Sequence, residues 1–204
     1  MQRALELLYR VRTAVDVGDF MISGAERDGY GVARAPHEQL LLRAPSHDEL
    51  EIALFVDEDV LHRLSGPLDE EHIPEYLLAV EGVSHFVYAI VHARAGQTFS
   101  ALELELQAEV DKYLLVLLGT WREGGNPRKD LRERLFYRIR YADDLSDEER
   151  ERYVTANAAA AEYVASLEER FVRHRAVDDM LAEMRRFYRL DCAAKLDHIA
   201  RKAA

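Results

Sequence analysis

Residues 74–95 constrain the fold of this chain most, because they form a long helical pattern that is apolar on nearly every side. Pro74 stands where a first helical turn tolerates proline, and Gly96 stands where it can end the helix. On a helical wheel the polar side chains fall into one stripe about 100° wide. This polar stripe consists of Glu81, Ser84, His85, Tyr88 and His92.

The polar stripe differs from the exposed face of an ordinary surface helix, which carries lysine, arginine, glutamate and glutamine. It contains no lysine and no arginine, and its side chains all act as metal ligands, acids, bases or hydrogen-bond partners. We therefore expect residues 74–95 to form the central helix, covered on several sides. Its carboxylate then requires a partner, because burial of an unpaired carboxylate is strongly unfavourable.

Residues 100–118 form the next helical segment. Their alternation of leucine and glutamate is also typical of a strand, but Ser100 and Glu103 form a capping box, and the segment is longer than most strands. The link over residues 96–99 is short, which favours antiparallel packing against residues 74–95.

Four side chains are expected to meet across this pair of helices: Glu81, His85, Glu105 and Glu109. Such a mixture of nitrogen and oxygen ligands in a helix bundle suits iron, manganese or zinc, and His92 is a further candidate ligand. In the alternative, structural interpretation, Glu81 and His85 pair with each other, and the stripe faces a partner subunit or a β-hairpin. The Glu-x-x-His pair of carboxylate-bridged di-iron bundles is absent from the sequence.

The 204 residues are expected to form a single domain. Within residues 1–73 the patterns predict a helix over 2–15, glycine-rich turns around a short strand at 19–23, a hairpin near 38–56 and a helix over 58–64. Within residues 74–204 they predict helices near 74–95, 100–118, 128–142, 146–173 and 176–202. The expected fold class is α+β, predominantly α, with a small N-terminal antiparallel β-hairpin packed on a bundle of about five helices.

The last predicted helix, residues 176–202, carries three polar side chains that continue its apolar stripe, namely Asp191, Lys195 and His198. They either complete a site lined by the central helix or belong to the surface. In the second case Asp191 and Lys195 form an i, i+4 ion pair, and the end of the helix emerges into water.

One basic segment stands out in this acidic chain. Residues 128–141 place six cations among three aromatic side chains, and the cations are Arg128, Lys129, Arg132, Arg134, Arg138 and Arg140. The segment is a candidate for binding an anion or a nucleic-acid strand, or for pairing with the acidic residues 57–72 of its own chain or of a second subunit. The net charge of −11 disfavours nucleic acid as a partner.

The sequence also excludes several classes of protein. Cys192 is the single cysteine, so an internal disulfide is impossible, and residues 1–15 lack the apolar run of a signal peptide. No uninterrupted apolar run approaches the roughly 18 residues of a membrane span, so we expect a cytoplasmic protein. These features favour a non-catalytic interaction, assembly or regulatory module that forms a homo-oligomer or binds a protein partner. The alternatives are a metal-dependent enzyme or metal-binding protein and, third, a nucleic-acid-associated factor.

Overall fold

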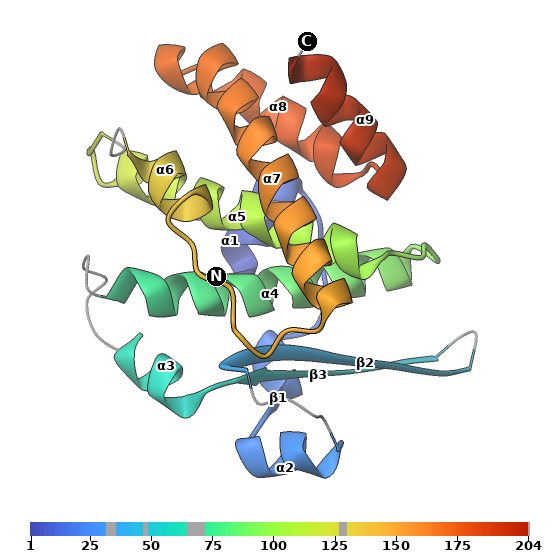
Figure 1. Cartoon of the computed structure of the whole chain (residues 1–204). Helices are drawn as coiled ribbons and strands as arrows, with labels where there is room; N and C mark the ends of the chain where they lie inside the picture. The colour runs from blue at the N-terminus through green and yellow to red at the C-terminus, as the bar shows by residue number, and fades with distance from the viewer. Residues whose placement is uncertain (32–35, 47–48, 65–71, 127–129, 204) are drawn as a thin grey trace.

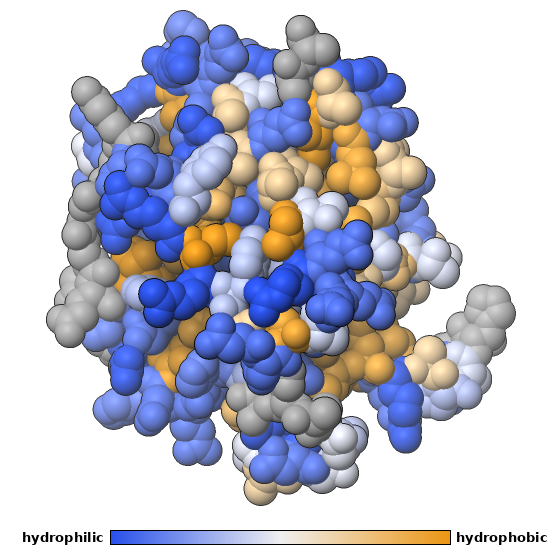
Figure 2. Space-filling model, viewed as in Figure 1, coloured by the Kyte–Doolittle hydropathy of each residue, from blue (hydrophilic) through white to orange (hydrophobic). Residues whose placement is uncertain are grey.

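The computed structural model describes residues 1–31, 36–46, 49–64, 72–126 and 130–203. Its fold is α+β and mainly α, as the sequence predicts. Figure 1 shows a small sheet on one side of helix α4, with the other long helices on the opposite side. The face seen in Figure 2 is largely hydrophilic, and apolar side chains show there in small, separate patches.

The first helix and the first strand are both shorter than the sequence predicts. Helix α1 (Gln2–Tyr9) ends early because Arg10 adopts a left-handed conformation, with φ of 53°. The strand predicted at 19–23 is divided between the 3-10 helix η1 (Val17–Phe20) and the two-residue strand β1 (Met21–Ile22).

The predicted glycine-rich turns after this strand are wrong in part, because helix α2 (Gly24–Gly29) forms there. Ser23 and Glu26 form a capping box at its start, in which each side chain bonds the backbone of the other residue. These bonds supply partners for the first backbone N–H groups, which every helix otherwise leaves unpaired.

The predicted hairpin is confirmed. Strands β2 (Glu38–Ser46) and β3 (Glu49–Val56) pair antiparallel, and β1 adds to β3 in parallel, so the order is β1-β3-β2. The last four residues of β3 are buried, and both long strands pack against α4. Helix α3 (Glu58–Arg63) follows, and the Asp57 side chain caps it.

Helix α4 (Ile73–Arg94) is the central helix, as the sequence predicts. It packs against helix α5 (Ala101–Arg122), both long strands, α1 and α3. It is long and apolar enough to cross a membrane, but more than half of its most apolar stretch is buried inside this fold, which is the position of a core helix. Helix α5 continues beyond its predicted end at residue 118 and ends at Arg122.

The next two helices along the chain pack against α5. Helix α6 (Leu131–Phe136) is much shorter than the predicted segment 128–142, whereas α7 (Asp147–Arg170) matches its prediction and crosses α5 through buried alanines. The 3-10 helix η3 (Val172–His174) leads into the last two elements. The single helix predicted over 176–202 is wrong: α8 (Val177–Tyr188) and α9 (Cys192–Ala203) are separate, because the Asp191 side chain accepts a hydrogen bond from Ala194 N and starts a new helix.

Candidate metal site

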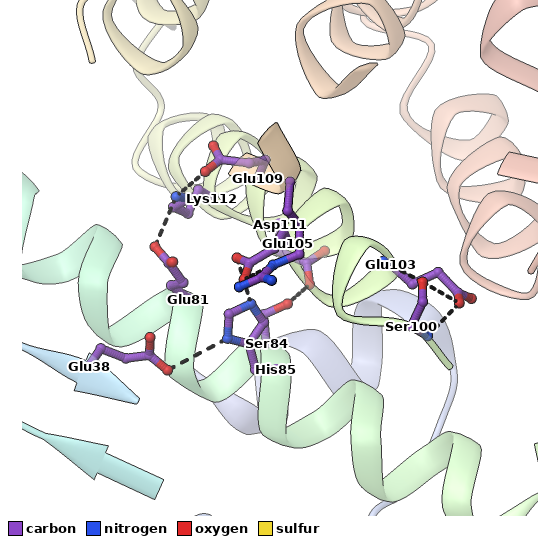
Figure 3. A network of polar contacts seen from close by, with 11 residues as sticks. Glu38, Glu81, Ser84, His85, Ser100, Glu103, Glu105, Glu109, Asp111 and Lys112 are labelled. Carbon is purple, nitrogen blue, oxygen red and sulfur yellow. Dashed lines mark hydrogen bonds and ion pairs between the residues drawn. The ribbon is translucent and has the colours of Figure 1, made fainter. Parts of the chain in front are cut away.

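Helices α4 and α5 bring together three of the predicted ligands. One ligand atom from each of Glu81, His85 and Glu105 can be chosen so that all three atoms lie within 4.8 Å of one another (Figure 3). Residues 81 and 85 are one helical turn apart, so both side chains project from the same face of α4 toward α5. The contact that the sequence predicts across this pair of helices is therefore present.

The imidazole of His85 lies between two carboxylates. Its Nδ1 atom is 3.6 Å from Oε1 of Glu38, and its Nε2 atom is 3.5 Å from Oε2 of Glu105. Both separations exceed the roughly 2.7–3.2 Å of an N–H···O hydrogen bond. Nε2 of His85 and Oε1 of Glu38 are buried, and neither has a hydrogen-bond partner among the described residues. Buried polar atoms of this kind are uncommon in proteins.

Glu38 is a member of the site that the sequence analysis missed. It is the first residue of β2 and reaches His85 across Gly82 of α4, where a missing side chain leaves room. The structural interpretation of the polar stripe did place it against a partner subunit or the hairpin, and this was the one indication that a hairpin residue belongs to the site. Nothing in the strand pattern indicated which hairpin residue would make the contact.

Glu109 joins the site through a lysine. Nζ of Lys112 donates to Oε1 of Glu109 at 2.6 Å and to Oε2 of Glu81 at 3.1 Å. Lys112 was also missed, although it follows Glu109 by three residues and therefore lies on the same face of α5. The predicted pairing of Glu81 with His85 alone is replaced by this bridge from α4 to α5.

A second cation comes from α7. Nε of Arg152 lies 3.6 Å from Oε1 of Glu105. We call the group formed by these side chains the carboxylate cluster, and its members are Glu38, Glu81, His85, Glu105, Glu109, Lys112 and Arg152. Among the described residues it holds four carboxylates and two permanent cations. With all four carboxylates ionised, two negative charges remain when His85 is neutral.

These charges shift the acidities within the carboxylate cluster. Burial alone would lower the pKa of His85, but Glu105 and Glu38 outweigh it and hold that pKa well above its usual value. Burial would raise the pKa of Glu81, yet the charges of Lys112 and His85 hold it below its usual value. Burial dominates for Glu38 and Glu109, whose pKa values are raised. The two carboxylates therefore favour the protonated form of the imidazole.

A cavity of about 530 Å³ adjoins the carboxylate cluster. Glu38, Glu81, Glu109 and Lys112 form its polar side. Its other walls are mainly apolar and aromatic, and they include Leu78, Ile139, Tyr141, Leu145 and Tyr153. This volume lies within the range of roughly 300–1,000 Å³ typical of small-molecule sites.

Two further residues of the polar stripe, Ser84 and Tyr88, belong to a separate buried network. Ser84 Oγ donates to Asp111 at 2.6 Å, and the Tyr9 hydroxyl donates to the same carboxylate. The Tyr88 hydroxyl donates to Glu103 at 3.2 Å. Burial raises the pKa of Asp111 to about 6.

Lys195 of α9 is completely buried in this second network. Its Nζ atom donates to the Tyr88 hydroxyl at 3.1 Å and to Oε1 of Gln107 at 2.9 Å, and it lies over the Tyr88 ring. Burial lowers the pKa of Lys195 to about 7. The surface ion pair considered for Asp191 and Lys195 is replaced by these contacts, and Asp191 instead caps α9.

The two remaining histidine candidates lie outside the carboxylate cluster. Nδ1 of His92 is 2.9 Å from the backbone carbonyl of Tyr88, so this nitrogen carries the proton, and the imidazole stacks on the Tyr88 ring. His198 is 2.5 Å from the Glu183 carboxylate on α8. Each of these two imidazoles therefore has a hydrogen-bond partner outside the carboxylate cluster.

The cations of the basic segment 128–141 differ in their contacts and exposure. Arg132 pairs with Glu168 of α7 at 2.9 Å, and Arg138 pairs with Glu133 at 2.7 Å, rather than with the described residues of the acidic segment 57–72. Arg134 is half-buried, and Arg140 is exposed and lines the cavity. The two other predicted cations, Arg128 and Lys129, lie outside the described residues.

No protein-family model, curated protein or solved structure matches this chain, so its function has to be argued from the geometry of the site.

Proposed function

We propose that this protein binds one divalent transition-metal ion through Glu81, His85 and Glu105. The observation that carries the proposal is the buried Nε2 atom of His85, which lies 3.5 Å from a Glu105 oxygen and has no hydrogen-bond partner among the described residues. Two ligands of a tetrahedral zinc ion, with bonds of about 2.0–2.2 Å, are about 3.4 Å apart. An ion at this position would therefore satisfy the unpaired nitrogen with small rotations of the three side chains.

The charge of the carboxylate cluster supports a divalent ion. Two negative charges are left over when His85 is neutral, and a divalent cation cancels them. Metal coordination requires the neutral imidazole, so the ion would replace the proton that His85 otherwise holds. A monovalent proton leaves the cluster with excess negative charge, whereas the metal ion makes it neutral.

Glu38 would orient the histidine rather than bind the ion. Metal-bound histidines commonly donate their second ring N–H to a carboxylate, which fixes the tautomer and the ring orientation. Nδ1 of His85 faces Glu38, while Nε2 faces Glu105, so each nitrogen has a different role in this proposal. Mixed imidazole and carboxylate ligation suits iron, manganese or zinc.

The adjoining cavity favours a catalytic ion over a purely structural one. Structural zinc sites are closed by four protein ligands, whereas catalytic sites keep a position open for water or substrate. Glu81 belongs both to the proposed ligand set and to the cavity wall, so a small molecule in the cavity would approach the ion directly. The chemistry that such an ion supplies is polarisation of a substrate carbonyl or phosphoryl oxygen, or activation of water.

Metal content of the purified protein tests this proposal. We expect about one equivalent of iron, manganese or zinc, and a lower thermal midpoint after chelation. His85→Gln should abolish the bound metal. His92→Gln is the matched control, because it removes a buried histidine of the same helix that already bonds a backbone carbonyl. Equal metal content in wild type, His85→Gln and His92→Gln, or a metal-free wild type that binds none on titration, would contradict the proposal.

We also propose protein–protein association as a second function, at a different surface. A groove of about 1,290 Å³ is lined mainly by α1 and the segment that follows it, and its lining includes Leu7 of α1, which is 66% exposed, and Leu61 of α3. Exposed apolar side chains around a groove are typical of interaction surfaces. A sizing column run at several protein concentrations tests association between copies of the chain. We expect Leu7→Asp to shift any concentration-dependent peak toward the smaller species, and an unchanged elution of both proteins at all concentrations would contradict this second proposal.

A further inference from the structure

Lys112 occupies an unusual place in the carboxylate cluster. Its ammonium group lies between Glu109 of its own helix and Glu81 of the neighbouring helix, at 2.6 and 3.1 Å (Figure 3). The side chain is 12% exposed, so the contact is a largely buried bridge and not a surface ion pair. The bridge also lies on the polar side of the cavity.

The pair of carboxylates around this ammonium resembles one half of a two-metal site. In such sites two ions lie about 3.5–4 Å apart. Glu81 belongs to the proposed ligand set and also contacts Lys112, so one carboxylate joins the two cation positions. Glu109 supplies a second oxygen ligand beside the Lys112 position.

We propose that the ammonium of Lys112 is a built-in cation that fills the second position of this carboxylate cluster, so that the chain takes one metal ion and not two. This inference rests on the proposed function, because it assigns the number of ions in the same site. Lys112 thus acts as a specificity-determining residue for the number of ions bound.

The consequence follows from the two carboxylates that flank the ammonium position. Replacement of Lys112 by the neutral side chain of methionine, which has a similar length, removes one positive charge from between two carboxylates. Burial of two carboxylates without a cation is unfavourable, so the vacated position should attract a divalent ion. The Glu109→Gln/Lys112→Met double variant removes one negative and one positive charge together, and it should therefore not attract a second ion.

Metal stoichiometry at saturation tests the inference. Wild type titrated with Zn²⁺ should bind one ion per chain, Lys112→Met should bind two, and the double variant should bind one. With Mn²⁺, electron paramagnetic resonance should show an isolated ion in wild type and an exchange-coupled pair in Lys112→Met.

Each outcome separates the two proposals. A wild type that binds no ion overturns the proposed function. A wild type that binds two ions in the carboxylate cluster, or a Lys112→Met variant that binds one, overturns the inference and leaves the proposed function intact. If Lys112→Met does not fold, Glu109→Gln decides, because it keeps Lys112 and should still bind one ion. Loss of the metal from Glu109→Gln would show that Glu109 itself binds the ion, so that the position assigned to Lys112 belongs to the metal, which would overturn the inference.

Discussion

The side chain of Glu38 fills the space that any side chain at Gly82 would occupy. A Cβ atom at position 82 would lie 2.8 Å from Cγ and 2.9 Å from Oε1 of Glu38, and 3.0 Å from a methyl group of Leu54. The absence of a side chain at this one helical position therefore allows the β2 carboxylate to reach His85.

Gly82→Ala should destabilise the protein. Alanine gains about 1 kcal/mol of helix propensity over glycine, but overpacking a core costs about 1–3 kcal/mol, so the net loss of stability should be about 0–2 kcal/mol. Denaturant unfolding measures the effect. Gly119→Ala in α5 is the control, because its Cβ would have no neighbour within 4 Å among the described residues, and it should gain stability. Equal effects of the two substitutions would show that the contact with Glu38 is unimportant.

Metal affinity should depend on pH through His85. The pKa of this imidazole is held well above its usual value, so metal binding at neutral pH must release a proton. Affinity should fall about tenfold for each pH unit below that pKa. Calorimetric titration in buffers of different ionisation enthalpy measures the released protons. An affinity that stays constant between about pH 5.5 and 7, where an unperturbed histidine of pKa about 6.5 titrates, would argue against His85 as a ligand.

The same imidazole should stabilise the metal-free protein in a defined pH range. Because the folded-state pKa of His85 is raised, its contribution is fully present below the unfolded-state value of about 6.5 and is lost as the pH rises through the folded-state pKa. The difference in free energy of unfolding between wild type and His85→Gln should therefore shrink as pH rises from about 6.5. A difference that grows over this range would mean that the ion pairs with Glu38 and Glu105 do not form in solution.

Lys195→Met should stabilise the protein at neutral pH. The pKa of Lys195 is lowered to about 7, so below that pH its buried charge opposes folding fully, and this cost disappears as pH rises toward the unfolded-state value of about 10.4. The gain is the removed cost of burying the ammonium group, less the roughly 1–3 kcal/mol for leaving the buried oxygen of Gln107 without its donor. Unfolding measured between about pH 7 and 10 should show the gain shrinking with pH.

The metal content of Lys195→Met should match that of wild type, because Lys195 belongs to the second network. A loss of stability at every pH would show instead that the hydrogen bonds of Lys195 to Tyr88 and Gln107 outweigh the cost of burying its charge.

The parts of the site that the sequence predicts depend on local periodicity. The apolar residues on nearly every side of segment 74–95 predict that it is the central helix. The short link to residues 100–118 predicts antiparallel packing, which brings Glu105 opposite His85. Both inferences need nothing beyond helix geometry and a short connection.

The parts that could not be predicted depend on docking between distant segments. Glu38 reaches the site because the hairpin packs on α4 at Gly82, and no pattern within the strand encodes that position. Lys195 is buried because α9 begins anew at Asp191 and turns its polar stripe toward Tyr88. A helical wheel that treats residues 176–202 as one continuous helix cannot represent the break between α8 and α9.

Anomalous diffraction from crystals grown with Zn²⁺ or Mn²⁺ would locate the bound ion. We expect one strong peak at the metal's absorption edge, bonded to Nε2 of His85 and to oxygens of Glu81 and Glu105, with Lys112 still between Glu81 and Glu109. Strong peaks confined to other residues, with the imidazole of His85 still held between Glu38 and Glu105, would contradict this expectation.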